Sequence, residues 1–125
     1  MSAQTAEINR AMTLYFDGLY HSDVARLEQV FHPKAIYACV TDGTLLYKTM
    51  AEYFEIVRNR EAPASRNEKR RDEIVSIDIA GENTAFVKAH CAIGPKYFTD
   101  FLTFIRTGAD WQIISKVFHF DLVEA

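Results

Sequence analysis

The sequence lacks the features that mark disulfide-stapled, metal-binding or membrane-spanning proteins. Among its 125 residues only Cys39 and Cys91 are cysteines, and they form no Cys-x-x-Cys motif. The four histidines are scattered, without the spacing of a zinc site. No apolar run approaches the roughly 20 residues that a membrane span needs, and residues 1–7 lack the basic and apolar regions of a signal peptide. We therefore expect no metal, no cofactor, no membrane contact and a cytoplasmic location.

The charge excludes a further class of partners. With 14 Lys and Arg against 17 Asp and Glu, the formal net charge is −3. The most densely charged segment, residues 61–73, has as many acids as bases. A nucleic-acid-binding surface would show an excess of basic residues with aromatic residues between them, so we expect no nucleic-acid partner. A hydrophobic content of 49% is typical of one compact domain, here residues 1–125.

The first third of the chain predicts two helices. Apolar side chains recur at helical spacing at Ile8, Met12, Tyr15, Phe16 and Leu19. This stripe predicts an amphipathic helix over residues 4–21 with Tyr15 on its core face. Ser22 and Asp23 offer an N-cap for a second, shorter helix, and Pro33 forbids its continuation.

A hairpin, a third helix and a set of strands follow. Residues 35–40 and 45–48 are rich in strand formers, and the Asp-Gly pair between them favours a tight turn. Thr49 and Glu52 form the capping-box pattern of a helix that should end near residue 60. Strand patterns then occupy residues 73–80, 84–93, 96–107 and 110–122. This order predicts a segregated α+β fold, with helices on one face of a curved antiparallel sheet.

The last predicted strand is apolar on both faces. Strict alternation places Trp111, Ser115 and His119 on one face, which we expect to meet the helices. The opposite face then carries Ile114, Lys116, Phe118 and Phe120. A sheet with one wet face should alternate apolar and polar residues. We therefore expect these four residues to form a homodimer interface on the outer face of the sheet.

Several short motifs together indicate a family. They are Tyr15-Phe16-Asp17-Gly18, Phe31-His32-Pro33, Asp100-Phe101-Leu102-Thr103-Phe104 and Trp111-Gln112-Ile113-Ile114-x-Lys116-x-Phe118-His119. Their order and spacing resemble the nuclear transport factor 2-like superfamily, and more narrowly its SnoaL-like branch, the putative lumazine-binding proteins. The resemblance spans nearly the whole chain. It implies a cone in which three N-terminal helices pack on a curved mixed, mainly antiparallel sheet and enclose a pocket.

The resemblance also implies which residues line that pocket. They are Tyr15, Tyr37, Cys39, His90, Asp100, Leu102, Trp111, Ser115 and His119, with His90 depending on which face of its strand points inward. Ketosteroid isomerase, a relative by fold, uses an Asp base with a Tyr and a protonated Asp as hydrogen-bond donors. The resemblance puts Tyr15 at the donor Tyr but Cys39 at the base and Leu102 near the second donor. Steroid-type isomerisation is therefore disfavoured.

Two functions remain open. The favoured one is a small-molecule-binding domain with an apolar pocket and few polar anchors. The alternative is a cofactor-free isomerase, dehydratase, cyclase or hydrolase, in which Asp100 orients His119 as a general base and Tyr15 donates a hydrogen bond. Non-catalytic roles are also open: Asp100 paired with backbone amides or Lys88, His119 exposed at a strand end, and Tyr15 as a core residue.

Overall fold

The helices form where the sequence supplies their caps. The computed structural model describes residues 2–123, and its α-helices are α1 (Ala3–Tyr20), α2 (Val24–Val30) and α3 (Met50–Asn59). The Asp23 side chain accepts from the Arg26 backbone N–H to cap α2. The predicted capping box of α3 is confirmed, with Thr49 and Glu52 each accepting from the other's backbone N–H. A 3-10 turn, η1 (Pro63–Arg66), lies in the charged segment.

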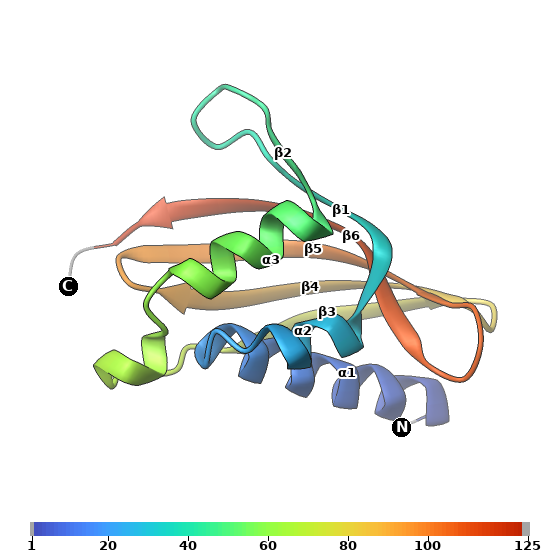
Figure 1. The fold of residues 1–125 in the computed structure, drawn as a ribbon. Helices are drawn as coiled ribbons and strands as arrows, with labels where there is room; N and C mark the ends of the chain where they lie inside the picture. The colour runs from blue at the N-terminus through green and yellow to red at the C-terminus, as the bar shows by residue number, and fades with distance from the viewer. Residues whose placement is uncertain (1, 124–125) are drawn as a thin grey trace.

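The strands form one mixed sheet. They are β1 (Phe31–Cys39), β2 (Leu46–Thr49), β3 (Glu73–Ala80), β4 (Thr84–Ile93), β5 (Lys96–Arg106) and β6 (Trp111–Leu122). Their order across the sheet is β2-β1-β6-β5-β4-β3, and β1 runs parallel to β6 while the other neighbours are antiparallel. The helices lie on one face of this curved sheet (Figure 1). The predicted α+β fold, with three helices on a mixed, mainly antiparallel sheet, is confirmed.

A bulge in β6 decides which of its residues face the helices. Thr103 of β5 lies opposite Ser115, but its neighbour Phe104 lies opposite Ile113, so Ile114 has no partner in the register. One extra residue reverses the alternation from that point on. Lys116 and Phe118 consequently face the helices and are buried, at 5% and 6% exposed.

This bulge overturns the predicted outer interface. Lys116 and Phe118 are enclosed on the inner face, Ile114 is half-buried at the bulge, and Phe120 packs against the core. Strict alternation was the wrong assumption for β6. The outer face instead exposes other apolar side chains, among them Phe86, Phe101 and Val117.

Two predicted pocket residues of β6 face outward because of the same bulge. Ser115 pairs with Thr103, whose neighbours Leu102 and Phe104 are fully buried, so Ser115 and Thr103 share the outer face. His119 pairs with Thr99 and is exposed. On β4 the buried residues are Ala85, Val87, Ala89 and Cys91. The prediction that His90 faces inward is therefore wrong, because Cys91 takes that face.

Candidate functional site

Polar side chains from five elements meet between the helices and the inner face of the sheet. They are Tyr15 of α1, Tyr53 of α3, Cys91 of β4, Asp100 of β5 and Lys116 of β6, and all are buried. We call this set the buried polar cluster. An aspartate and a lysine inside an apolar core are unusual, since charged groups are costly to bury unless they are paired.

Asp100 is the acceptor at the centre of the cluster. The Tyr15 hydroxyl donates to its Oδ2 at 2.5 Å, and the Cys91 thiol lies 3.8 Å from the same oxygen. The other oxygen, Oδ1, is buried and has no hydrogen-bond partner among residues 2–123. Burial and the nearby Asp100 charge raise the pKa of Tyr15 well above its ordinary value, and they do the same to the pKa of Cys91. Both groups therefore stay protonated near neutral pH.

Lys116 sits in a cage of aromatic rings. Its Nζ donates to the Tyr53 hydroxyl at 3.4 Å and lies 5.1–5.6 Å from the ring centroids of Tyr15, Tyr37, Tyr53 and Phe118. Burial alone lowers the pKa of Lys116, but the neighbouring Tyr53 and Asp100 outweigh it, and the pKa is raised. The cage and the carboxylate thus hold a charged ammonium inside the core.

A pocket opens at one end of the inner face, beside this cluster. It has a volume of about 490 Å³ and lies where the end of α3, η1 and the β4–β5 turn meet β1 and β6. Its aromatic lining comes from Tyr37, Phe98, Phe118 and Phe120. Phe118 lies 4.8 Å from Tyr37 and 5.7 Å from Phe98 between ring centroids. We call it the aromatic pocket.

One layer of side chains separates the aromatic pocket from the buried polar cluster. Tyr37 and Phe118 line the pocket, and their rings also contact Lys116 on the other side. Burial raises the pKa of Tyr37, although the Lys116 charge opposes this effect. A ligand that displaced either ring would therefore reach an ammonium group, a phenol and a carboxylate.

The rim of the aromatic pocket is mainly basic. Arg60, Arg66 and Lys96 line it, against Glu61 as the acid. Arg66 is paired with Glu68 at 2.7 Å. The Lys96 Nζ lies 4.5 Å from the centroid of the Phe120 ring.

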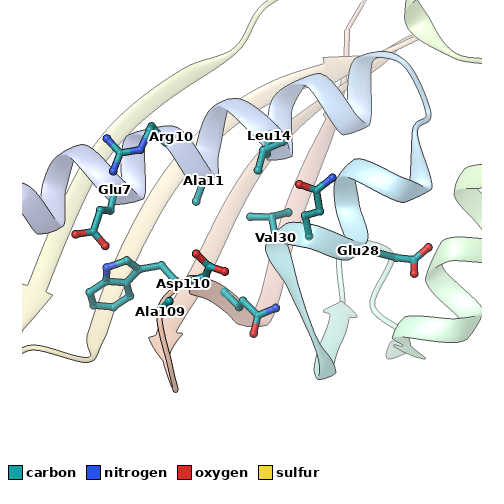
Figure 2. Close-up of a pocket in the computed structure, with 11 residues that line it drawn as sticks. Glu7, Arg10, Ala11, Leu14, Glu28, Val30, Ala109 and Asp110 are labelled. Carbon is teal, nitrogen blue, oxygen red and sulfur yellow. The ribbon is translucent and has the colours of Figure 1, made fainter.

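A second pocket lies between α1, α2 and the start of β6. Figure 2 shows it between Glu7, Arg10 and Leu14 of α1, Val30 at the end of α2, and Asp110 before β6. Its volume is about 640 Å³, and its lining carries acids and a base rather than a ring of aromatic side chains. We call it the helix-side pocket. Neither pocket has a member of the buried polar cluster in its lining, but the rings of Tyr37 and Phe118 in the aromatic pocket lie against Lys116.

The predicted site residues divide between these places. Tyr15 and Asp100 meet in the cluster, Tyr37 lines the aromatic pocket, and Leu102 is a core residue. Cys39 is buried near the end of β1, where its sulfur contacts the Thr41 hydroxyl. Trp111 lines the helix-side pocket.

The predicted pair of Asp100 and His119 is not formed. Asp100 faces the helices, whereas His119 is on the outer face with its ring nitrogens near Thr41 and Asp121. His90 contacts Glu73 on the same outer face. Ser115 joins neither pocket. Asp100 instead accepts a hydrogen bond from Tyr15 and lies near Lys116.

Sequence reasoning missed Lys116, Tyr53, Cys91 and Phe118. A signal for Lys116 was present, because the consecutive Ile113 and Ile114 break the alternation two to three residues before it. Within residues 2–123 no group of His, Cys, Asp and Glu side chains is arranged to hold a metal ion. In the same range no helix has both the length and the apolar character to cross a membrane.

Known proteins with similar sequences and structures support one assignment. The family model described as putative lumazine-binding matches residues 3–119. The chain is 27% identical over 108 residues to the aldolase FrzH of Cladobotryum sp.. The matched region covers 84% of this chain and 82% of that protein.

Two solved structures share the fold. An NTF2-like protein of unknown function from Silicibacter pomeroyi has a TM-score of 0.85 at 23% identity, covering 97% of this chain and 100% of that one. A ketosteroid isomerase-like protein from Erwinia carotovora atroseptica has a TM-score of 0.73 at 11% identity, covering 96% and 98%. The chain belongs to the putative lumazine-binding family and has the fold of the nuclear transport factor 2-like superfamily.

Proposed function

We propose that this protein is a small-molecule-binding domain that holds a ring-containing, largely apolar ligand in the aromatic pocket. The observation that carries the proposal is the aromatic lining of this space by Tyr37, Phe98, Phe118 and Phe120. Its volume of about 490 Å³ falls in the range of roughly 300–1,000 Å³ that small-molecule sites occupy. Flat rings stack well in such a lining, and lumazine, the compound in the family's description, is itself a flat bicyclic ring.

The test is an NMR titration of the labelled protein with lumazine and with 2-naphthol. We expect the largest amide shifts around Phe98, Phe118 and Phe120, and a weaker affinity in Phe120→Ala. The matched control is Phe86→Ala, which removes a ring from the outer face and should leave the affinity unchanged. Equal affinities in the two variants, or shifts centred on the helix-side pocket, would contradict the proposal.

A second candidate function is a cofactor-free enzyme. It is favoured by the buried Asp100, Tyr15 and Lys116 and by the relative that is named an aldolase. Perturbed ionisable groups beside a pocket are typical of catalytic sites. The Asp100 carboxylate would take a proton from the carbon next to a carbonyl group, and the Lys116 ammonium would stabilise the enolate oxygen that forms. Some isomerases, dehydratases, cyclases and aldolases use such a step.

This candidate requires the Tyr37 or Phe118 ring to move aside, since both stand between the pocket and Lys116. The test measures by NMR how fast the α-protons of 1-indanone exchange in D2O. The rate with the protein is compared with the uncatalysed rate. Catalysed exchange should disappear in Asp100→Asn and in Lys116→Met, and should persist in the outer-face control Lys88→Met. Exchange at the background rate with the unmodified protein would contradict an enzyme of this kind.

We also propose that the protein is a homodimer through the outer face of the sheet. Phe101 and Val117 are directly paired there, and the Phe86 ring lies 5.7 Å from the Phe101 ring between centroids. Lys88 and Asp78 lie beside this patch on the same face. Because a two-fold interface meets itself, a patch that carries both charges suits a second copy of the chain. Phe101→Glu should give a monomer in sedimentation velocity, and a dimer that persists in this variant would contradict the interface.

A further inference from the structure

We propose that the ligand of the aromatic pocket carries a carboxylate and that Arg60 binds it. The inference rests on the proposed binding function and adds the chemical class of the ligand: a flat ring system bearing a carboxylate group. It is carried by Arg60, which belongs to the lining of the aromatic pocket and lies directly after the end of α3.

The Arg60 side chain has donors that the protein does not use. Its Nε and Nη2 atoms are buried, and neither has a hydrogen-bond acceptor among residues 2–123. A buried cationic donor without an acceptor is costly, so proteins seldom leave one in place. The neighbouring Glu61 is exposed and does not provide that acceptor.

The geometry of the two free donors selects the kind of anion. Nε and Nη2 lie on one edge of the planar guanidinium, and their N–H bonds can engage both oxygens of a carboxylate at once. Arg60 is also close enough to the Tyr37 ring to lower the pKa of Tyr37 in opposition to the effect of burial. A carboxylate on Arg60 would thus place an attached ring beside Tyr37.

The other cations of the pocket are already engaged. Arg66 is paired with Glu68, and the Lys96 ammonium lies over the Phe120 ring. Lys116 lies behind the pocket wall, enclosed by its aromatic cage. Arg60 is therefore the cation of this pocket that combines a place in the lining with free buried donors among the described residues.

The experiment compares 2-naphthoate with its neutral amide, 2-naphthamide, by isothermal titration calorimetry. The two molecules share the ring and differ in charge. With the unmodified protein we expect 2-naphthoate to bind roughly ten times more tightly, because a charge-assisted pair of hydrogen bonds is stronger than a neutral one. Arg60→Gln should reduce this preference to about twofold or less. The matched control Arg58→Gln, on α3 and outside the pocket lining, should retain it.

The outcomes separate this inference from the binding function. If both compounds bind the unmodified protein equally well, or if R60Q keeps the preference, the carboxylate assignment is overturned. The proposed binding of ring-containing ligands in the aromatic pocket is then still supported. If neither compound binds, the inference is overturned together with the proposed binding of ring-containing ligands. Arg60→Lys gives a second measure, since it keeps the charge but loses the paired donors. Its preference should fall between those of R60Q and the unmodified protein, and an undiminished preference would overturn the bidentate contact.

Discussion

Two cations, Lys116 and Arg60, have buried nitrogen atoms in opposite surroundings. Lys116 has a hydrogen bond to Tyr53, four aromatic rings around it and the charge of Asp100 nearby. Arg60 has two buried donors without an acceptor in the described chain. The fold itself stabilises the charge of the first, whereas the second lacks a comparable set of partners.

The folded chain itself supplies the partners of the Lys116 charge, whereas a ligand can supply the missing acceptors of Arg60. Replacing a satisfied buried cation leaves its partners unpaired and destabilises the protein. Replacing a cation whose buried donors have no acceptor removes the free-energy cost of those donors and weakens ligand binding instead. The three predictions below test this contrast, from the largest expected effect to the smallest.

The largest effect is expected for Lys116→Met. It removes the positive charge near the buried Asp100, and the loss is expected to stay below the cost of breaking a direct buried pair, about 3–5 kcal/mol. Urea unfolding measures the change. The double variant Asp100→Asn with Lys116→Met should be less destabilised than Lys116→Met alone, because it removes both charges. Simple additivity of the two single changes would show that Asp100 and Lys116 do not interact.

A moderate loss of stability is expected at alkaline pH. Cys91, Tyr15 and Lys116 have pKa values raised above their ordinary values of 9.0, 10.0 and 10.5. Above pH 9 the unfolded chain releases these protons first, so it binds fewer protons than the folded chain, and stability falls as pH rises.

Each group contributes up to about 1.4 kcal/mol per pH unit, and urea unfolding at pH 8, 9 and 10 measures the slope. Cys91→Ala should flatten the fall between pH 9 and 10, where the thiol is the first of the three groups to titrate in the unfolded chain. An unchanged slope in this variant would show that burial in the cluster does not perturb the thiol.

The smallest effect, with the opposite sign, is expected for Arg60→Met. Without ligand, removing the unsatisfied guanidinium should raise the free energy of unfolding by up to about 1 kcal/mol. The matched variant Arg66→Met loses its ion pair with Glu68, and such half-exposed pairs contribute roughly 0–1 kcal/mol. Arg66→Met should therefore be neutral or slightly destabilised. A clear destabilisation by Arg60→Met would mean that the protein does satisfy Arg60.

Local sequence signals were sufficient for most of the fold. The apolar stripe of α1, the Thr49–Glu52 capping box and the Asp-Gly turn act over a few residues, so they can be identified in the sequence alone. The order of the elements and the family motifs supplied the architecture. The helical period placed Tyr15 on the inner side, and the family resemblance placed Tyr37 and Asp100 there.

The site was less predictable because it depends on one bulge. Reading β6 with strict alternation exchanges Lys116 and Phe118 with Ser115 and His119, which moves a buried lysine to the surface and brings a surface histidine into the pocket. The bulge appears in the pairing of β6 with β5, and its local signal in the sequence is the broken alternation at Ile113 and Ile114. The free donors of Arg60 likewise depend on where the end of α3 places that side chain relative to β1 and β6.

The most direct test of the account is the position of bound 2-naphthoate, determined from intermolecular NOEs on the isotope-labelled protein. We predict contacts from the ring protons of the ligand to Tyr37, Phe118 and Phe120, with its carboxylate end near the Arg60 side chain. Contacts to Leu14 and Trp111 in the helix-side pocket instead would contradict the assignment of the aromatic pocket as the binding site.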